Sequence, residues 1–431
     1  MSWQEIYHSK MTTAEEAVEM VQSGDNVFIP ISSGAPKTLI PALVNRGSEL
    51  RDVNILHLST LGEARYTDPE FEGHFRHIAL FIGENVREAV NEGRADYVPV
   101  FFHEVPSLFR RGIYALDVAM IHVSPPDEHG FCSYGVAVDT TKPAAEAAKT
   151  VIAEVNPNMP RTLGDSFIHV RNIDYIVPCD YPLEEYPAAE YTDVHASIAS
   201  HIAGLIENGS TIQLGIGAIP EAVLTSLDNK EDLGVHTEMF SDGLIDLIER
   251  GVVNCAKKSL HPGKIIATFL MGSRKLYDFV DNNPLIEFRP VHYVNDPSVI
   301  AQNNQMVAIN SALQVDLTGQ ICADSIGHQF YSGFGGQLDF IRGAAHSEGG
   351  KPIIAMPATA RDGEVSRIVS ELYPGSGVVT TRADVHYIVT EYGVAELHGK
   401  TIRDRVHALI SIAAPQFRDK LRSDAKQYNY I

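Results

Sequence analysis

The sequence is poor in cysteine and in positive charge, and it lacks long apolar runs. Its four cysteines lie far apart among 431 residues, with no Cys-x-x-Cys pair, so we expect reduced thiols in a cytoplasmic protein. Its 34 basic residues are outnumbered by 55 acidic ones, and the formal charge of −21 argues against nucleic acid and anionic membranes as partners. No apolar run approaches the roughly 18 residues of a membrane helix, and the N-terminus is not Arg-rich like a mitochondrial presequence.

The composition is that of a folded globular chain, with 44% hydrophobic and 21% charged residues. Its length favours two domains. Strand patterns alternate with helical patterns in both halves, which predicts open α/β domains with mostly parallel sheets flanked by helices.

Three local patterns occur once in each half and in the same order, which indicates an internal duplication. The first pattern, a strand with a Gly turn and a helix, spans residues 24–39 and 209–223. The second, a turn between strands, spans residues 127–132 and 316–322, and the third, a late strand, spans residues 174–178 and 386–390. The Pro- and Glu-rich segment 182–187 predicts a boundary near residue 190, which gives domains 1–190 and 191–431.

A glycine loop at Gln213–Pro220 follows a strand and opens a helix, so its backbone N–H groups are candidates for holding an anion or an oxyanion. It resembles the dinucleotide fingerprint only in part, because Pro220 occupies the third glycine position. Glu238 lies about 20 residues on, where a ribose-binding acid would stand, so the spacing alone leaves NAD binding open. A tight turn without a ligand is the other alternative.

Glu238 stands in a short β-like run that ends in turn residues, Thr-Glu-Met-Phe-Ser-Asp-Gly. Ligand sites of open α/β sheets lie at the carboxyl edge of the strands, where such a run presents its side chains. A carboxylate that is desolvated beside backbone donors is able to attack a thioester. Glu238 is therefore a candidate nucleophile.

A second glycine-rich loop, Ser332–Gly336, precedes a predicted helix. An N–H from Gly335 or Gly336 would stabilise an oxyanion, although a plain loop fits the sequence equally well. On the helix that follows, Asp339 and Arg342 are three residues apart and are expected to form a structural pair.

Other chemistries leave weak traces. No Gly-x-Ser-x-Gly elbow is present, which argues against an α/β-hydrolase triad. His103-Glu104 resembles the start of a zinc-protease helix, but Pro106 would break that helix, so no metal is expected.

Taken together, the motifs resemble the class I CoA-transferase family, in its branch of 4-hydroxybutyrate and butyrate CoA-transferases related to acetyl-CoA hydrolases. The resemblance covers essentially the whole chain. It rests on Phe102–Leu108, Val123–Asp127, Gln213–Pro220, Thr237–Met239, Gly333–Phe340 and Thr390–Ala395.

This resemblance implies a ping-pong transfer of CoA between short-chain carboxylates, 4-hydroxybutyrate or butyrate and acetate, through a thioester on Glu238. It implies no cofactor other than CoA as substrate, and a homodimer or homotetramer. The residues that it implies for CoA contacts and oxyanion stabilisation are Gln213, Leu214, Gly215, Ile216, Gly217, Asn295, Asn310, Gly335 and Gly336. Asn295 would complete one oxyanion hole, although its Asn-Asp-Pro context is also typical of a turn.

The loop Ser32–Pro36 is expected to lie across a cleft from Glu238 and to set acyl specificity. It lacks a Glu-Pro pair that is typical of the branch, so the preferred acid is left open. Two other functions also stay open: a short-chain acyl-CoA hydrolase that uses the same glutamate, and a CoA-binding module without catalysis.

Overall fold

The computed structural model describes residues 1–431. Contacts divide the chain into a first unit, Met1–Pro187 with Ile266–Val294, and a second unit, Ala188–Ile265 with Asn295–Ile431. The chain leaves the first unit close to the predicted boundary at residue 190. It then returns to the first unit over residues 266–294, a segment that the predicted division into 1–190 and 191–431 assigned to the second domain.

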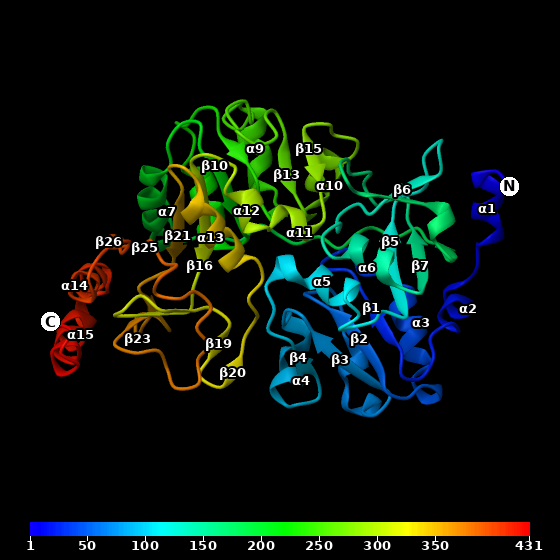
Figure 1. Ribbon diagram of the computed structural model, residues 1–431, viewed down its shortest axis with the longest axis horizontal. Helices are drawn as coiled ribbons and strands as arrows, with labels where there is room; N and C mark the ends of the chain where they lie inside the picture. The colour runs from blue at the N-terminus through cyan, green and yellow to red at the C-terminus, as the bar shows by residue number, and fades with distance from the viewer. The chain divides into compact units, whose positions relative to one another are not determined.

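The first unit is built on a seven-stranded sheet in the order β4-β3-β2-β1-β5-β7-β9, and every neighbouring pair is parallel (Figure 1). Its strands are β1 (Asn26–Phe28), β2 (Val53–His57), β3 (Phe75–Ala79), β4 (Asp96–Tyr97), β5 (Val118–Val123), β7 (Thr150–Val155) and β9 (Tyr175–Pro178). All six residues of β5 are buried, as expected for a strand covered on both faces.

The second unit is built on a six-stranded sheet in the order β11-β10-β16-β21-β25-β26. The first five strands are parallel, and β26 pairs antiparallel with β25. The strands are β10 (Thr211–Leu214), β11 (Gly234–Val235), β16 (Met306–Ser311), β21 (Lys351–Ala355), β25 (Tyr387–Thr390) and β26 (Gly393–Glu396).

The two sheets share one strand order, because β2-β1-β5-β7-β9 in the first unit matches β11-β10-β16-β21-β25 in the second. The first and third sequence repeats fall on equivalent strands, β1 with β10 and β9 with β25. The turn after β5 and the turn after β17 (Gln314–Asp316) are held alike: the Asp127 carboxylate accepts from the N–H groups of residues 129 and 131, and the Asp316 carboxylate accepts from those of residues 318 and 320. Two open α/β units of the same plan agree with the predicted duplication.

The helices of the first unit are α1 (Trp3–Ser9), α2 (Ala14–Val18), α3 (Leu39–Asn45), α4 (Arg87–Asn91), α5 (Val105–Arg110), α6 (Thr141–Ala147), α10 (Arg274–Val280) and α11 (Val291–Val294). Those of the second unit are α7 (Asp193–Leu205), α8 (Ala218–Thr225), α9 (Gly243–Glu249), α12 (Pro297–Ile300), α13 (Gln337–His346), α14 (Ile402–Ile412) and α15 (Pro415–Gln427). Helix α13 packs on β16 and β21, and α7 packs on α8 and β25.

Short strands complete the units. In the first unit β6 (Phe131–Ser133) pairs with β8 (Phe167–His169). In the second unit β17 pairs with β18 (Ile321–Cys322) and β24 (Ile368–Val369), β19 (Ser325–Ile326) pairs with β20 (Gln329–Phe330), and β22 (Thr359–Ala360) pairs with β23 (Val365–Ser366). The remaining short strands are β12 (Met239–Phe240), β13 (Ile265–Ala267), β14 (Phe269–Leu270) and β15 (Ile286–Phe288).

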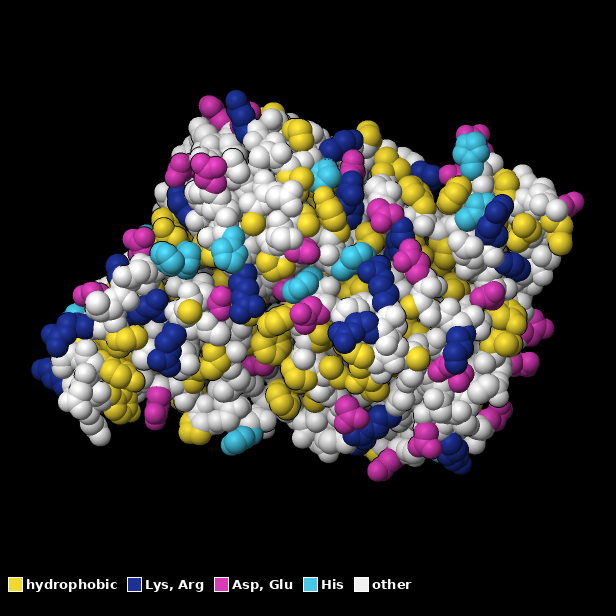
Figure 2. Space-filling view, viewed as in Figure 1, with side chains coloured by type: hydrophobic (Ala, Val, Ile, Leu, Met, Phe, Trp, Pro, Cys, Tyr) yellow, Lys and Arg dark blue, Asp and Glu magenta, His cyan; other side chains and the backbone are white.

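The surface carries charges of both signs. Figure 2 shows basic and acidic side chains interspersed over one face, with no large basic area on that face. None of the helices combines the length and the apolar character that crossing a bilayer requires.

Candidate active site

The predicted site residues of the second unit gather at the carboxyl edge of its sheet. Strands β11, β10 and β16 run parallel, so their carboxyl ends lie on the same side. Glu238 follows β11, the Gly215–Gly217 loop follows β10, and Asn310 is the next-to-last residue of β16. This edge is where a ligand of an open α/β sheet is expected.

The carboxylate of Glu238 is held by Asn295 and faces Gly336. The side-chain amide of Asn295 donates a hydrogen bond to Oε2 of Glu238 at 2.6 Å. A Cβ atom at Gly336 would lie 1.9 Å from that same oxygen and 2.2 Å from Nδ2 of Asn295. A side chain at residue 336 would therefore displace the Glu238 carboxylate and the Asn295 amide, although the φ of −96° is open to any residue.

Asn295 lies between α11 and α12 and is fully buried. The turn that its sequence context suggested is formed by its neighbour: Asp296 caps α12 by accepting from the N–H of Ser298 at 2.7 Å. The side chain of Asn295 takes no part in this cap and donates to Glu238, while its Oδ1 accepts no hydrogen bond. The turn and the contact with Glu238 coexist on adjacent residues.

Thr237 fixes the backbone beside Glu238, and sequence reasoning did not single it out. Its hydroxyl lies 3.1 Å from the carbonyl oxygens of both Leu214 and Met239. The hydroxyl thus ties the residue after Glu238 to the end of β10. A hydroxyl residue directly before a candidate nucleophile at a strand end was the available signal.

The glycine loop after β10 is open. Gly215 and Gly217 have no neighbouring atom within 4 Å of the place where a Cβ would stand, and Gly217, with a φ of 114°, directly precedes α8. At the base of the loop Gln213 accepts a hydrogen bond from the amide of Asn310 at 3.2 Å. The loop therefore leaves room for a ligand beside two paired amide side chains.

The structure brings the predicted residues together in two groups. Glu238, Asn295 and Gly336 touch directly, with Gly335 adjacent in the left-handed region at a φ of 51°. Gln213 and Asn310 form the second group. The two groups are linked because the hydroxyl of Thr237, next to Glu238, lies 3.1 Å from the carbonyl oxygen of Leu214, next to Gln213. Ile216 is partly exposed in the loop. Arg342 pairs with Asp384 at 3.1 Å and Asp339 is buried, and the structural pair of Asp339 with Arg342 stays a prediction.

The loop Ser32–Pro36 belongs to the first unit. Ser32 and Ser33 are buried, and the hydroxyl of Ser33 lies 3.2 Å from that of Tyr277. Its expected role in acyl specificity stays a prediction.

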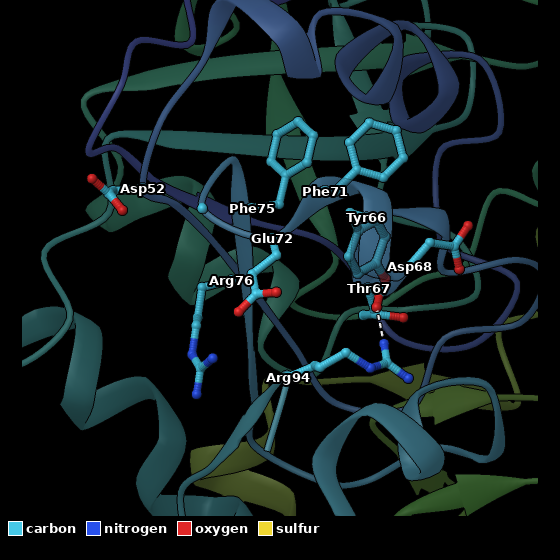
Figure 3. Close-up of a pocket in the computed structure, with 10 residues that line it drawn as sticks. Asp52, Tyr66, Thr67, Asp68, Phe71, Glu72, Phe75, Arg76 and Arg94 are labelled. Atoms are coloured by element: carbon cyan, nitrogen blue, oxygen red, sulfur yellow. Dashed lines mark hydrogen bonds between the residues drawn. The ribbon is translucent and has the colours of Figure 1, made fainter. Parts of the chain in front are cut away.

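A pocket in the first unit lies among short loops around β3 (Figure 3). Its volume is only about 70 Å³. Both of its arginines are already engaged, Arg76 with Asp96 at 2.7 Å and Arg94 with the carbonyl of Thr67 and with Glu92. The pocket therefore offers neither the room nor the spare charge that a phosphorylated substrate requires.

His122 and Glu154, which are buried, and the partly buried Cys179 form a group of metal-ligand type in the first unit. The carboxylate of Glu154 accepts from the Cys179 thiol at 3.6 Å and from the Tyr181 hydroxyl. Burial, with the nearby Glu154, raises the pKa of the Cys179 thiol to about 12. Glu154, Cys179 and Tyr181 thus form a hydrogen-bonded network, while Nε2 of His122 lies 3.1 Å from the amide of Asn156.

A partly buried carboxylate that accepts from an amide donor and faces a close glycine backbone is an arrangement suited to acyl transfer. Residues 1–182 match the acetyl-CoA hydrolase/transferase N-terminal domain, and residues 272–425 match the corresponding C-terminal domain. The chain belongs to the acetyl-CoA hydrolase/transferase family.

The relatives that share 37–55% identity with the chain are named CoA transferases. The chain is 55% identical to the 4-hydroxybutyrate coenzyme A transferase of Clostridium kluyveri, over 99% of this chain and 100% of the relative. It is 39% identical to the butyryl-CoA:acetate CoA-transferase of Anaerostipes caccae, over 99% and 98% of the two chains. The crystal structure of a 4-hydroxybutyrate CoA-transferase from Porphyromonas gingivalis superposes with a TM-score of 0.87 at 41% identity, covering 99% and 100%. The protein is an enzyme of the CoA-transferase type.

Proposed function

We propose that this enzyme moves CoA between short-chain monocarboxylates, butyrate or 4-hydroxybutyrate and acetate, by a ping-pong mechanism through a thioester on Glu238. The names of the two relatives support the substrate class. The observation that carries the mechanism is the carboxylate of Glu238 held at 2.6 Å by the Asn295 amide.

The first half-reaction has two steps. Glu238 attacks the carbonyl carbon of the acyl-CoA, and the C–S bond breaks to give a mixed anhydride and the CoA thiolate. The thiolate then attacks the side-chain carbonyl carbon of Glu238, and the acyl carboxylate leaves. No net proton transfer is required, and an incoming carboxylate reverses both steps on the glutamyl-CoA thioester.

Asn295 supports both states of Glu238. Its N–H donates to Oε2 while this oxygen belongs to a carboxylate, and the same donor is in place when the charge returns to that oxygen in the tetrahedral intermediate. A preorganised donor of this kind contributes roughly 3 kcal/mol to such a step. Backbone N–H groups of the 335–336 loop are the candidates for a second donor.

We propose further that the enzyme is a cytoplasmic homo-oligomer that needs no cofactor beyond its CoA substrate. Four unpaired cysteines support a reducing compartment.

The test is to incubate the protein with butyryl-CoA and no acceptor, reduce with borohydride, and map the modified peptide by mass spectrometry. The expected result is CoA-dependent reduction of the Glu238 side chain, absent in Glu238→Gln. Release of butyrate at the same rate with and without acetate would instead favour an acyl-CoA hydrolase. CoA binding without turnover in the wild type would favour a binding module.

A further inference from the structure

Arg367 is a partly buried cation that forms no salt bridge. It stands between β23 and β24, in the otherwise uncharged run Val365–Val369. Its backbone is fixed, because its N–H donates to Ala358 and its carbonyl accepts from Val315, both at 2.9 Å. Its guanidinium makes one side-chain hydrogen bond, to the carbonyl of Ala312 at 3.4 Å, and it forms no salt bridge within 4.0 Å.

The surroundings of the Arg367 guanidinium only partly compensate its positive charge. Burial lowers the pKa of Arg367, and the neighbouring Glu391 and Tyr331 offset that effect only in part. A cation that is partly withdrawn from water is stabilised by an anionic partner, and the guanidinium of Arg367 makes only one hydrogen bond within the protein. The arginines of the pocket in Figure 3 are paired with carboxylates, whereas Arg367 is not. Such a guanidinium fits an anion that arrives with a ligand.

Arg367 lies at the same edge of the sheet as the active site. Ala312 directly follows β16, Ala358 follows β21, and Glu391 directly follows β25. The Glu391 carboxylate accepts from the N–H of Ala358 at 2.8 Å, which holds these strand ends together. Because strands are spaced about 4.8 Å apart, the ends of β16 and β21 lie two to three spacings from β11, roughly 10–15 Å from the Glu238 end.

This distance matches the arm of CoA. The pantetheine chain between the thiol and the diphosphate is comparable in bond number to about four residues of extended peptide, which span roughly 13–14 Å. A thioester placed at Glu238 therefore brings the diphosphate to the neighbourhood of Arg367. Between them lie the open glycine loop after β10 and the Gln213–Asn310 pair.

We propose that Arg367 binds the diphosphate of the acyl-CoA substrate and so fixes the pantetheine arm across the ends of β10 and β16. The inference rests on the proposed function, since it takes the thioester to lie at Glu238. Arginine suits this role because its planar guanidinium binds two phosphate oxygens at once.

The test compares a substrate that carries the phosphates with one that lacks them. Specificity constants are measured with butyryl-CoA and with butyryl-pantetheine for wild type, Arg367→Gln, Arg367→Lys and the control Arg422→Gln, which removes an exposed arginine of α15. Arg367→Gln is expected to lose about tenfold to hundredfold with butyryl-CoA and less than about twofold with butyryl-pantetheine. Arg367→Lys should fall between wild type and Arg367→Gln, and Arg422→Gln should match wild type with both substrates.

Equal losses with both substrates would overturn the proposal, because the side chain would then act on the acyl end or on the fold. A raised KM for acetate with either donor would assign Arg367 to the acceptor carboxylate instead. Calorimetric binding of free CoA to Glu238→Gln, with and without Arg367→Gln, reads the phosphate contact without catalysis. A weakened CoA affinity in the double variant would support the role of Arg367 even if the nucleophile proved to be another residue, whereas an unchanged affinity would contradict it.

Discussion

Replacing Gly336 by alanine would force the nucleophile out of its position. The added Cβ would stand 1.9 Å from Oε2 of Glu238 and 2.2 Å from Nδ2 of Asn295, whereas ordinary contact begins at about 3.4 Å. The carboxylate must therefore retreat by about 1.5 Å, or the loop must open by a similar amount. Either movement breaks the 2.6 Å hydrogen bond between the two side chains.

The expected consequence is a large loss of rate without a large loss of stability. A hydrogen bond to a charged group contributes about 1.5–3 kcal/mol, and a misplacement of about 1 Å costs on the order of a hundredfold in rate. We expect kcat for CoA transfer from butyryl-CoA to acetate to fall at least about a hundredfold. Residue 336 precedes α13 with a φ that alanine tolerates, so the free energy of unfolding should change by less than about 1 kcal/mol.

Gly204→Ala is the matched control. Gly204 lies in α7, and a Cβ there meets no atom within 4 Å. This change should leave transfer unchanged and raise the helix stability by up to about 1 kcal/mol. If Gly336→Ala has the kcat and the unfolding midpoint of the wild type, the placement of Glu238 against the 335–336 loop is refuted.

Three further changes test the same structure. Asn295→Ala should lower kcat/KM by about tenfold to hundredfold through loss of a charged hydrogen bond, with unaltered circular dichroism; an unchanged constant would remove Asn295 from the mechanism. Thr237→Val should lower kcat several-fold and stability by about 1 kcal/mol, while Thr237→Ser keeps both, because only the hydroxyl joins Leu214 and Met239. Burial lowers the pKa of His77 to about 4, so the unfolded chain binds its proton first and stability falls as the pH drops from about 6.5 toward 4. The decrease in unfolding free energy from pH 7 to pH 5, measured with denaturant, should be roughly 2 kcal/mol smaller in His77→Gln than in the wild type. An identical decrease in both proteins would contradict the assignment.

The fold was predictable because its signals are local and occur twice. The turn at Asp127 and the turn at Asp316 need only a carboxylate that reaches N–H groups two and four residues ahead, and this pattern is visible in the sequence. The glycine loop after β10 was located in the same way, since glycine and proline mark the passage from strand to helix.

The rest depends on contacts between distant residues, which no local pattern encodes. The return of residues 266–294 to the first unit is decided by packing. Arg342 pairs with Asp384, 42 residues along the chain, and no local pattern around Arg342 points to this partner. The apposition of Gly336 and Glu238 likewise joins two segments that are far apart in the sequence, and only the family resemblance linked them beforehand.

The two halves share a strand order but differ at the helix that follows their first strand. In the first unit the carboxylate of Glu154, the next-to-last residue of β7, accepts from the N–H groups of Thr38 and Leu39 at the start of α3, both at 2.7 Å. An incoming phosphate would there meet a negative charge of the protein itself. In the second unit the next-to-last residue of β21 is the apolar Ile354, and the loop at Gly217 is open before α8. The glycine loop before α8 therefore lacks the strand-borne carboxylate that caps the start of α3 in the first unit.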